Sequence, residues 1–545
     1  MSNFRDLRQL VQHLESCGKL YRFKEPVNKD TEIGALFRVQ MRGVPENKRK
    51  ALLFENVVGS AHGRYDMSVL SGIYGASTDI LAIALGCENY VELLDKWHMA
   101  LANPIAPTII EGGPVQEEVH TGDALQQIGL DAFPVPVEEP GFSGILRTGL
   151  PMITRDPATG VRNVGTYNAF FRAKDRMVAA IGSVHDAMRY HWQAARRRNE
   201  GMPLAILIGC TPEVMLVGSA DIPYGVDELS VAGGLAGAPL ELVRCKTIPL
   251  EVPAHCEAVI EGIVSTEVAE PRLPFGEYPG YLNVDYNVRP VFKVTAITHR
   301  KGAWFTPVTV GFPPSDTNLV WGFTHAAQLY HILRYEKSLP VAEVQFPQLG
   351  GGSDFCLLRI DDGVSQETVQ KIIAELENSG PAKYMVIVDH DIALNDPEMI
   401  IWAMSFRTRP REDLKIFTGG IGGLDPSAAV TGSGQGKMES AGSRDQYSRV
   451  VINATRKYPY PPLALPRKQF MDKALEIWRQ QKDLPEPEMR PPWHGYELGY
   501  WTEEMQRFAD MIVDGQYLKI GEEMAKRQKP ITEDMFGRRT EKAAS

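Results

Sequence analysis

The chain has 545 residues, which is too long for one hydrophobic core, so about two to four domains are expected. Its hydrophobic fraction of 43% and charged fraction of 23% are those of an ordinary globular protein. The formal net charge of −10 argues against broad nucleic-acid binding and against attachment to an anionic membrane.

The sequence shows no segment that would direct the chain out of the cytoplasm. No apolar run approaches the length of a membrane span, and residues 1–16 carry charges where a signal peptide has an apolar block. The six cysteines are scattered and form no CxxC pair, which argues against a cysteine metal site and indicates reduced thiols. We therefore expect a cytoplasmic protein that binds neither membranes nor nucleic acids.

The first predicted region, residues 1–118, mixes helices with short strands. Apolar residues at positions 4, 7, 10, 11 and 14 follow helical spacing, and Gly18 is a suitable stop. A strand is predicted over 19–27, and helical stretches around 30–42 and 77–101. The segment 102–119 is rich in turn residues and predicts the first domain boundary.

The second predicted region, residues 119–310, is dominated by strands. The sequence PMITRDPATGVRNVGTYNAFF, which begins at Pro151, predicts a hairpin with its turn over 156–160. Further short strands are predicted at LAILIGC, VMLVGSADIP, LELVRCKTIPLEVPAHCEAVIEGIV and PVFKVTAITHR. This pattern is typical of a β-barrel with a few inserted helices.

The third predicted region, residues 311–490, alternates strands with helices. FCLLRID and KYMVIVD flank the helical sequence SQETVQKIIAELENS, which predicts an α/β layer. Residues 491–545 are predicted to form a helical tail whose polar end frays or docks on a neighbour. The predicted fold class is therefore mixed α/β (α+β).

Three polar residues far apart in the sequence could share a metal ion. Asn163 begins a strand after a tight turn, His185 is predicted in the first turn of a helix with a Ser183–Asp186 capping box, and Glu228 follows a loop into another helix. Each alone has a simpler explanation: turn chemistry, a histidine packed at a helix start, or a dipole partner. Together they offer the mixed O, N and O donors that suit Mn²⁺, Mg²⁺ or Fe²⁺.

Glu277 lies in the rigid segment PRLPFGEYPGYL, residues 271–282. Three prolines fix backbone angles there, and Gly276 and Gly280 permit the close approach of another group. The carboxylate is either satisfied by turn amides or held beside a substrate as a general acid/base. Arg272 stands five residues before it.

The helix predicted after His185 ends in three arginines, Arg196–Arg198. The simpler explanation is that these arginines are solvated at the end of the helix. The more specific explanation is that they bind an anionic ligand. His191 is predicted to be structural. The sequence has no P-loop, no GxGxxG between a strand and a helix, and no GxSxG nucleophile elbow.

Several motifs occur together in a recognisable order. RNVGTY, IPYGVDE and PFGEYPGY follow one another with His185 between the first two, DLRQLVQHLESCGKLYRFKEPVNKDTEI lies near the N-terminus, and DHDIALNDPEMIIWAMSFRTRP, LDPSA and NATRKYP lie in the C-terminal part. The sequence thereby resembles the UbiD family of decarboxylases, relatives of polyprenyl-hydroxybenzoate decarboxylase and ferulic acid decarboxylase, over nearly its whole length. The resemblance implies an N-terminal α/β region, a split β-barrel like that of flavin reductases and a C-terminal α/β oligomerisation domain.

The resemblance also implies prenylated FMN as cofactor, with a divalent metal and K⁺ at its phosphate. Asn163, His185 and Glu228 take the family's metal-ligand positions, and Ser219 and Pro223 fall where the family lines its cofactor. The implied reaction is the reversible, non-oxidative loss of CO₂ from an aromatic or α,β-unsaturated acid, with the modified flavin as electron sink. A flavin prenyltransferase would supply the cofactor, and a homodimer that assembles to a homohexamer is implied.

Two positions depart from the family pattern. Asn168 stands where an arginine is expected, and Arg272 stands where a glutamate is expected, so that only Glu277 remains as the proton donor. Asn168 can accept and donate hydrogen bonds but lacks a forked cation. One hypothesis is that Arg272 anchors the substrate carboxylate instead, with Arg147 on the barrel hairpin as a helper.

A second hypothesis is that the substrate is already activated. Phthaloyl-CoA, whose thioester withdraws electrons from the ring, would be decarboxylated to benzoyl-CoA, and Arg196–Arg198 could meet the CoA phosphates. The alternatives are a free aromatic or α,β-unsaturated acid of the hydroxybenzoate type, a non-catalytic cofactor-binding subunit, and an NAD(P)H-dependent flavin reductase.

Overall fold

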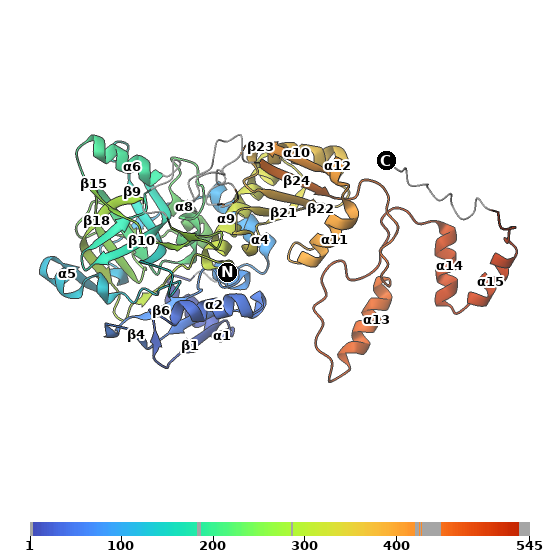
Figure 1. Ribbon diagram of the computed structural model, residues 1–545, viewed down its shortest axis with the longest axis horizontal. Coiled ribbons are helices and arrows are strands. Elements are labelled where there is room, and N and C mark those ends of the chain that lie inside the picture. The colour runs from blue at the N-terminus through green and yellow to red at the C-terminus, as the bar shows by residue number, and fades with distance from the viewer. Residues whose placement is uncertain are drawn as a thin grey trace, which may run out of the picture. The chain divides into compact units, whose positions relative to one another are not determined.

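The computed structural model describes residues 4–181, 187–284, 287–419, 425, 427 and 448–532. The chain divides into two compact units, one made of Met1–His390 with Pro397–Thr455 and the other of Asp391–Asp396 with Arg456–Ser545 (Figure 1). The longer segment of the second unit thus begins at Arg456, ahead of the boundary predicted after residue 490.

The N-terminal region is built on a four-stranded sheet of order β1-β3-β6-β19, in which the last strand returns from the far end of the barrel region. Helix α1 (Leu7–Ser16) is capped by Asp6 and buries its predicted apolar face. The helical stretch predicted over 77–101 is two helices, because Gly86 ends the first in a left-handed conformation and Asn89 caps the second. The elements are β1 (Leu20–Phe23), α2 (Ile33–Gly43), β3 (Ala51–Phe54), β6 (Ser68–Ser71), α3 (Thr78–Leu85), α4 (Tyr90–Ala102) and β19 (Trp304–Phe305).

The predicted barrel is confirmed: six antiparallel strands in the order β11-β10-β9-β12-β15-β18 close through pairing of β11 with β18 (Figure 1). Alternate residues fill the interior with apolar side chains, as in other small barrels. The predicted hairpin is the β9–β10 pair. The strands are β9 (Leu146–Arg155), β10 (Arg162–Ala173), β11 (Arg176–Ala179), β12 (Met202–Ile208), β15 (Ala258–Pro271) and β18 (Val288–His299), with β8 (Glu118–Thr121) added beside β18.

The strand predicted at VMLVGSADIP is wrong, because its first residues belong to helix α7 (Pro212–Val217). Pro212 occupies the first turn, where proline is favoured, and every residue of the helix is buried. An apolar run without periodicity does not distinguish a buried strand from a buried helix.

The C-terminal part of the first unit is a five-stranded sheet of order β20-β21-β22-β24-β23. Strands β21 and β22 are parallel and are joined through α10, so the predicted α/β layer is confirmed. The elements are β20 (Val341–Gln345), β21 (Phe355–Ile360), α10 (Gln366–Ser379), β22 (Tyr384–Val388), α11 (Pro397–Arg407), α12 (Pro410–Asp413), β23 (Leu414–Thr418) and β24 (Ser448–Ala454).

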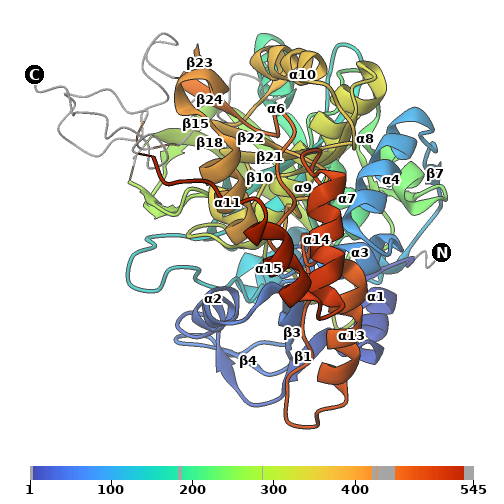
Figure 2. The ribbon, with the colours of Figure 1, turned by 90° about the vertical axis from the view of Figure 1, so that its right-hand side faces the viewer.

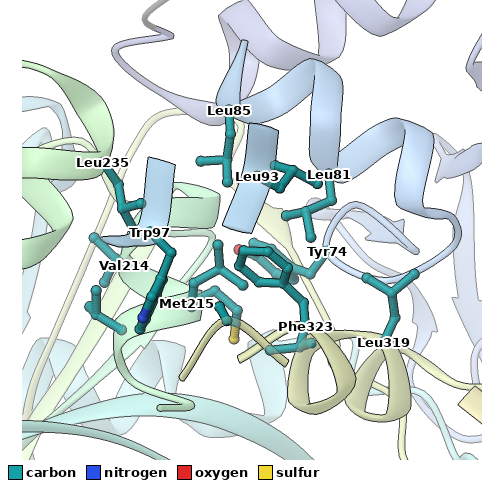
Figure 3. Packing of buried hydrophobic residues seen from close by; sticks show 14 of the residues in the cluster. Tyr74, Leu81, Leu85, Leu93, Trp97, Val214, Met215, Leu235, Leu319 and Phe323 are labelled. Atoms are coloured by element: carbon teal, nitrogen blue, oxygen red, sulfur yellow. The ribbon is translucent and has the colours of Figure 1, made fainter. Parts of the chain in front are cut away.

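A hydrophobic core lies where α3 and α4 meet α7, α8 (Glu228–Ala236) and α9 (Asp316–Tyr330) (Figures 2 and 3). Trp97 of α4 and Phe323 of α9 meet edge to face, with ring centroids 6.1 Å apart. Met215 of α7 and Leu235 of α8 pack around them (Figure 3). This core fixes α7 and α8 beside the barrel strand β10, where the candidate site lies.

Smaller elements complete the first unit: β2 (Val27–Asn28), β4 (Val57–Gly59), β5 (Gly63–Arg64), β7 (Thr108–Ile109), α5 (Gly122–Ile128), α6 (Ala187–Arg197), β13 (Glu241–Arg244) and β14 (Glu251–Pro253). The second unit contains α13 (Lys468–Arg479), α14 (Glu503–Val513) and α15 (Tyr517–Ala525). Among the residues that the structure describes, no helix has the length and apolar character needed to cross a membrane.

Candidate active site

Strand β10 carries two of the predicted site residues. Asn163 lies at its start, opposite Thr154 of β9, and Asn168 lies further along, opposite Gly149. The two are an odd number of positions apart, so their side chains leave opposite faces of the strand. The strand therefore joins two distinct parts of the site.

The first part brings Asn163 together with Glu228. Both are buried, and the Nδ2 atom of Asn163 and the Oε2 atom of Glu228 have no hydrogen-bond partner among the described residues. Burial raises the pKa of Glu228 to about 7, and the backbone N–H of Val164, next to Asn163, acts in the opposite direction. The unpartnered Oε2 of Glu228 is an oxygen donor that suits a hard cation, whereas the unpartnered Asn163 Nδ2 is a hydrogen-bond donor and only the amide oxygen of Asn163 could coordinate one.

The third predicted ligand, His185, lies outside the described residues. Within those residues no group of three His, Cys, Asp or Glu side chains is arranged to hold a metal ion. A metal beside Glu228 would therefore need the Asn163 amide together with His185. The nearby pair of Arg162 and Asp227, 3.8 Å apart, ties the start of β10 to the residue that precedes α8.

Ser219 lies two residues beyond α7, against the outer face of β10. Its hydroxyl donates to Thr166 Oγ1 at 3.0 Å and to the Met215 carbonyl at 2.9 Å, and its own carbonyl accepts from Thr324 of α9 at 3.2 Å. Pro223 is exposed, and its carbonyl closes the turn that leads into α8 by accepting from Val226. The segment from Ser219 to Glu228 is thus anchored at both ends.

The second part of the site is the hairpin that carries Glu277. Strands β16 (Phe275–Gly276) and β17 (Leu282–Asn283) pair, and the Glu277 N–H and C=O both close the turn between them. The carboxyl group is buried and accepts from Asn283 Nδ2 at 3.1 Å. Burial raises its pKa, and the positive charge of Arg147 opposes that shift. Glu277 is therefore held by a side chain as well as by its turn.

Arg147 connects these elements from β9. Its guanidinium donates to Asn168 Oδ1 at 3.2 Å and to the carbonyl of Gly276, next to Glu277, at 2.7 Å. It also lies 4.9 Å from the centre of the Phe275 ring. The side chain is almost completely buried, and its Nε has no hydrogen-bond partner among the described residues.

Arg272 is brought to the same place, since its guanidinium lies 5.5 Å from the centre of the Phe275 ring. It is buried, and its backbone N–H donates to the Asn287 carbonyl. Both arginines therefore flank one aromatic ring beside Glu277, which places two cations near one candidate acid.

The sequence reasoning missed two acids of this site, Glu138 and Glu139. Glu138 accepts from the Val310 N–H at 2.8 Å and from Arg147 at 3.4 Å, and Glu139 lies 3.7 Å from Arg147. Burial raises the pKa of Glu138 to about 7. Two adjacent acids between Pro136 and Pro140 were the signal that could have found them.

The other singled-out residues lie elsewhere. His191 of α6 is buried and bonds to Thr154 at 2.8 Å, as expected for a structural histidine. The three arginines that end and follow α6 are exposed, and Arg198 pairs with Glu200 at 3.7 Å. Their contacts are those of a solvated helix end.

Comparison with known proteins identifies the family. Models of three domains of 3-octaprenyl-4-hydroxybenzoate carboxy-lyase match the chain: the N-terminal domain over residues 11–97, the Rift-related domain over 108–313 and the C-terminal domain over 318–454. The chain belongs to the UbiD family. An uncharacterized protein of Aquifex aeolicus is 33% identical over 485 residues, which are 84% of this chain and 92% of the relative.

Solved structures of UbiD-class enzymes resemble the chain along most of its length. HmfF from Pelotomaculum thermopropionicum in complex with FMN is 31% identical, with a TM-score of 0.71 over 85% of this chain and 96% of that one. An evolved dimeric form of HmfF in complex with prFMN is 29% identical, with a TM-score of 0.70 over 83% and 95%. The apo 3,4-dihydroxybenzoic acid decarboxylase of Enterobacter cloacae, 22% identical, shares the fold, with a TM-score of 0.72 over 90% and 99%.

Proposed function

We propose that this UbiD-family chain catalyses the reversible, non-oxidative decarboxylation of an aromatic carboxylic acid with prenylated FMN as cofactor. The observation that carries the proposal is the buried Glu277 carboxyl, which is held by Asn283 and faces the Arg147 guanidinium. A carboxyl group whose pKa is raised by burial stays protonated closer to neutral pH and can give a proton to carbon. The cofactor-bound HmfF structures support the flavin.

In this proposal Asn163, His185 and Glu228 would hold a divalent metal, Mn²⁺, Fe²⁺ or Mg²⁺, and K⁺ would be a second cation required for cofactor binding. The unpartnered, buried Oε2 of Glu228 supports that assignment. Ser219 and Pro223 would line the cofactor from the segment that enters α8. When bound, the modified flavin supplies the electron sink for the pair of electrons left by the departing CO₂.

In this proposal Arg272 and Asn168 orient the substrate. The Arg272 guanidinium binds the carboxylate, while Asn168 acts through Arg147, to which it is hydrogen-bonded. Loss of CO₂ leaves an electron pair on carbon, and the proton of Glu277 then fills that position. Water returns a proton to Glu277, so one proton is consumed per CO₂ released.

For the substrate we propose phthaloyl-CoA, which would yield benzoyl-CoA. The exposed arginines at the end of α6, of which Arg198 is paired with Glu200, are the residues that would meet the CoA phosphates in this proposal. A free aromatic or α,β-unsaturated acid of the hydroxybenzoate type is the alternative substrate. A non-catalytic cofactor-binding subunit is the alternative role.

The deciding experiment is anaerobic production of the full chain together with a flavin prenyltransferase. The mass and absorption spectrum of the small molecule released by acid should be those of prenylated FMN, and the loaded protein should release CO₂ from aryl-CoA or free aromatic acids. Unmodified FMN, or no flavin, from folded and metal-loaded protein would favour the non-catalytic role. Oxidation of NAD(P)H without CO₂ release would indicate a flavin reductase.

Arg196–Arg198→Ala separates the two substrate classes. The triple substitution should raise KM for an aryl-CoA substrate and leave KM for a free acid unchanged. Native mass measurement on the same sample tests the proposed homodimer and homohexamer.

A further inference from the structure

Glu138 has unusual surroundings for an acid of the barrel rim. One oxygen, Oε2, accepts from the Val310 backbone at 2.8 Å and from Arg147 at 3.4 Å. The other, Oε1, is buried and has no hydrogen-bond partner among the described residues. A carboxylate with an unsatisfied buried oxygen is costly, whereas a carboxyl group that carries a proton is less so.

The guanidinium of Arg147 also interacts with the segment that carries Glu277. The Nη2 group of Arg147 that faces Glu138 donates to the carbonyl of Gly276, the residue before Glu277. The charge of Arg147 favours the ionised form of both acids. One cation is thus placed between two buried carboxyl groups that come from different segments of the chain.

The other charged groups around Glu138 do not remove this competition. Arg38 donates to the carbonyls of Val310, Phe312 and Pro314, at 2.7, 2.9 and 3.3 Å, and its charge also favours the ionised form of Glu138, less strongly than that of Arg147. Glu139 adds a negative charge 3.7 Å from Arg147, and Asp316 is the acid buried near Arg38. Arg272, whose guanidinium lies 5.5 Å from the centre of the Phe275 ring, also favours the ionised form of Glu277.

We propose that Glu138 is a positioning residue of the active site, which shares the Arg147 guanidinium with Glu277 so that the two carboxyl groups hold one proton between them. In the resting protein Glu277 carries the proton and Glu138 is paired with Arg147. When Glu277 has given its proton to carbon, Arg147 stabilises the new carboxylate and Glu138 takes up a proton from water. The resting state returns when water reprotonates Glu277 and Glu138 gives up its proton, so one proton is consumed per cycle. The charge around Arg147 stays constant through the cycle, which lowers the cost of ionising Glu277 in a buried site.

This inference rests on the proposed function only for the role of Glu277 as proton donor. Its test therefore needs neither substrate nor cofactor. The carboxylic-acid and carboxylate forms are separated by infrared difference spectroscopy on the full chain as a function of pH. The variants are Glu138→Gln, Glu277→Gln and the double variant, with Glu267→Gln as control because Glu267 is exposed on β15.

Among the buried carboxyl groups of the wild-type protein, which include Glu228, two should titrate in separate steps and both should be absent from the double variant. Each single variant should keep one group, which titrates about one pH unit below the upper wild-type step, because its competitor for Arg147 is gone. The control should match the wild type. Because coupling is reciprocal, Glu277→Gln alone decides the matter if Glu138→Gln does not fold.

The proposal is overturned if each single variant retains the wild-type midpoint of the remaining group, since the two acids would then titrate independently. It is also overturned if Glu138 stays ionised throughout, as in a permanent ion pair. Coupled titration in a protein that releases no CO₂ from any acid would support the shared guanidinium while refuting the decarboxylase proposal.

Discussion

Arg147 of β9 donates to the side-chain oxygen of Asn168 of β10 over 3.2 Å, diagonally across the hairpin. Sequence reasoning treated Asn168 as a weakened substitute for a cation. The geometry shows that a buried guanidinium is present at that place and that Asn168 is one of its acceptors. A positive charge from the neighbouring strand therefore lies beside Asn168.

We predict that Asn168→Ala raises KM for the acid about tenfold, because Arg147 loses one of its anchors. Asn168→Asp should lower kcat/KM further, since a carboxylate would pair with Arg147 and neutralise it. Initial rates of CO₂ release at several substrate concentrations provide the measurement. Equal kinetics for both variants and the wild type would show that Arg147 does not depend on this contact.

Glu277→Gln should lower kcat for CO₂ release by about 10²-fold or more, because the amide keeps the shape but has no acidic proton. The pKa of Glu277 is raised by burial, so the wild-type rate should be sustained towards neutral pH and fall once the pH exceeds that raised pKa. The flavin content should be unchanged in the variant. A loss of flavin together with activity would instead assign Glu277 to cofactor binding.

The protonation of Glu228 should make both metal affinity and the stability of the metal-free protein depend on pH. Its pKa of about 7 lies above the ordinary value of 4.5, so its contribution to stability is complete below about pH 4.5 and is lost as the pH rises through 7 in metal-free protein. Mn²⁺ binds the ionised form and should raise Tm more at pH 8 than at pH 6.

The matching variant is Glu228→Gln, which should bind no Mn²⁺ and should be more stable than metal-free wild type at pH 8, by on the order of 2 kcal/mol. Melting curves with and without Mn²⁺, together with metal analysis, test both expectations. A Mn²⁺-dependent rise in Tm that survives in the variant would place the metal elsewhere.

Gly276→Ala should impair the site without unfolding the protein. A Cβ atom there would lie 2.2 Å from Oε1 of Glu139, so the acid or the hairpin that carries Glu277 must move. We expect at least a tenfold lower kcat/KM with little change in Tm. Gly112→Ala is the control, because a Cβ there meets no atom within 4 Å. Similar activity of the two variants would show that the hairpin tolerates the shift.

Much of the architecture follows from patterns that the sequence displays directly. The β9–β10 hairpin has a turn signal between two apolar strands, and α10 has a helical period between two short strands. The helix α7 was missed because a six-residue buried run has no period to reveal it. The local sequence pattern predicts an element correctly wherever one face of that element is apolar and the other is polar.

The contacts within the candidate active site were harder to predict from local sequence patterns. Donor chemistry groups Asn163 and Glu228 in the sequence and the family resemblance strengthens that prediction. Asn163 lies at the start of β10, and the backbone N–H of the next residue, Val164, acts on Glu228. Glu138 and Arg147 are adjacent only because the segment before the barrel returns against β9 and the loop at Val310. Contacts of this kind depend on tertiary packing and leave no spacing in the sequence.

The placement of Asn163 and Asn168 on one strand has a consequence for how this enzyme family can diversify. Five residues of extended chain span roughly 16 Å, and the ladder to β9 makes that length rigid. Deleting or inserting a single residue between them would turn one side chain to the wrong face. A change of side chain, such as the one that places Asn168 beside Arg147, keeps this spacing, whereas changes in chain length would be tolerated only in the loops at the ends of the strand.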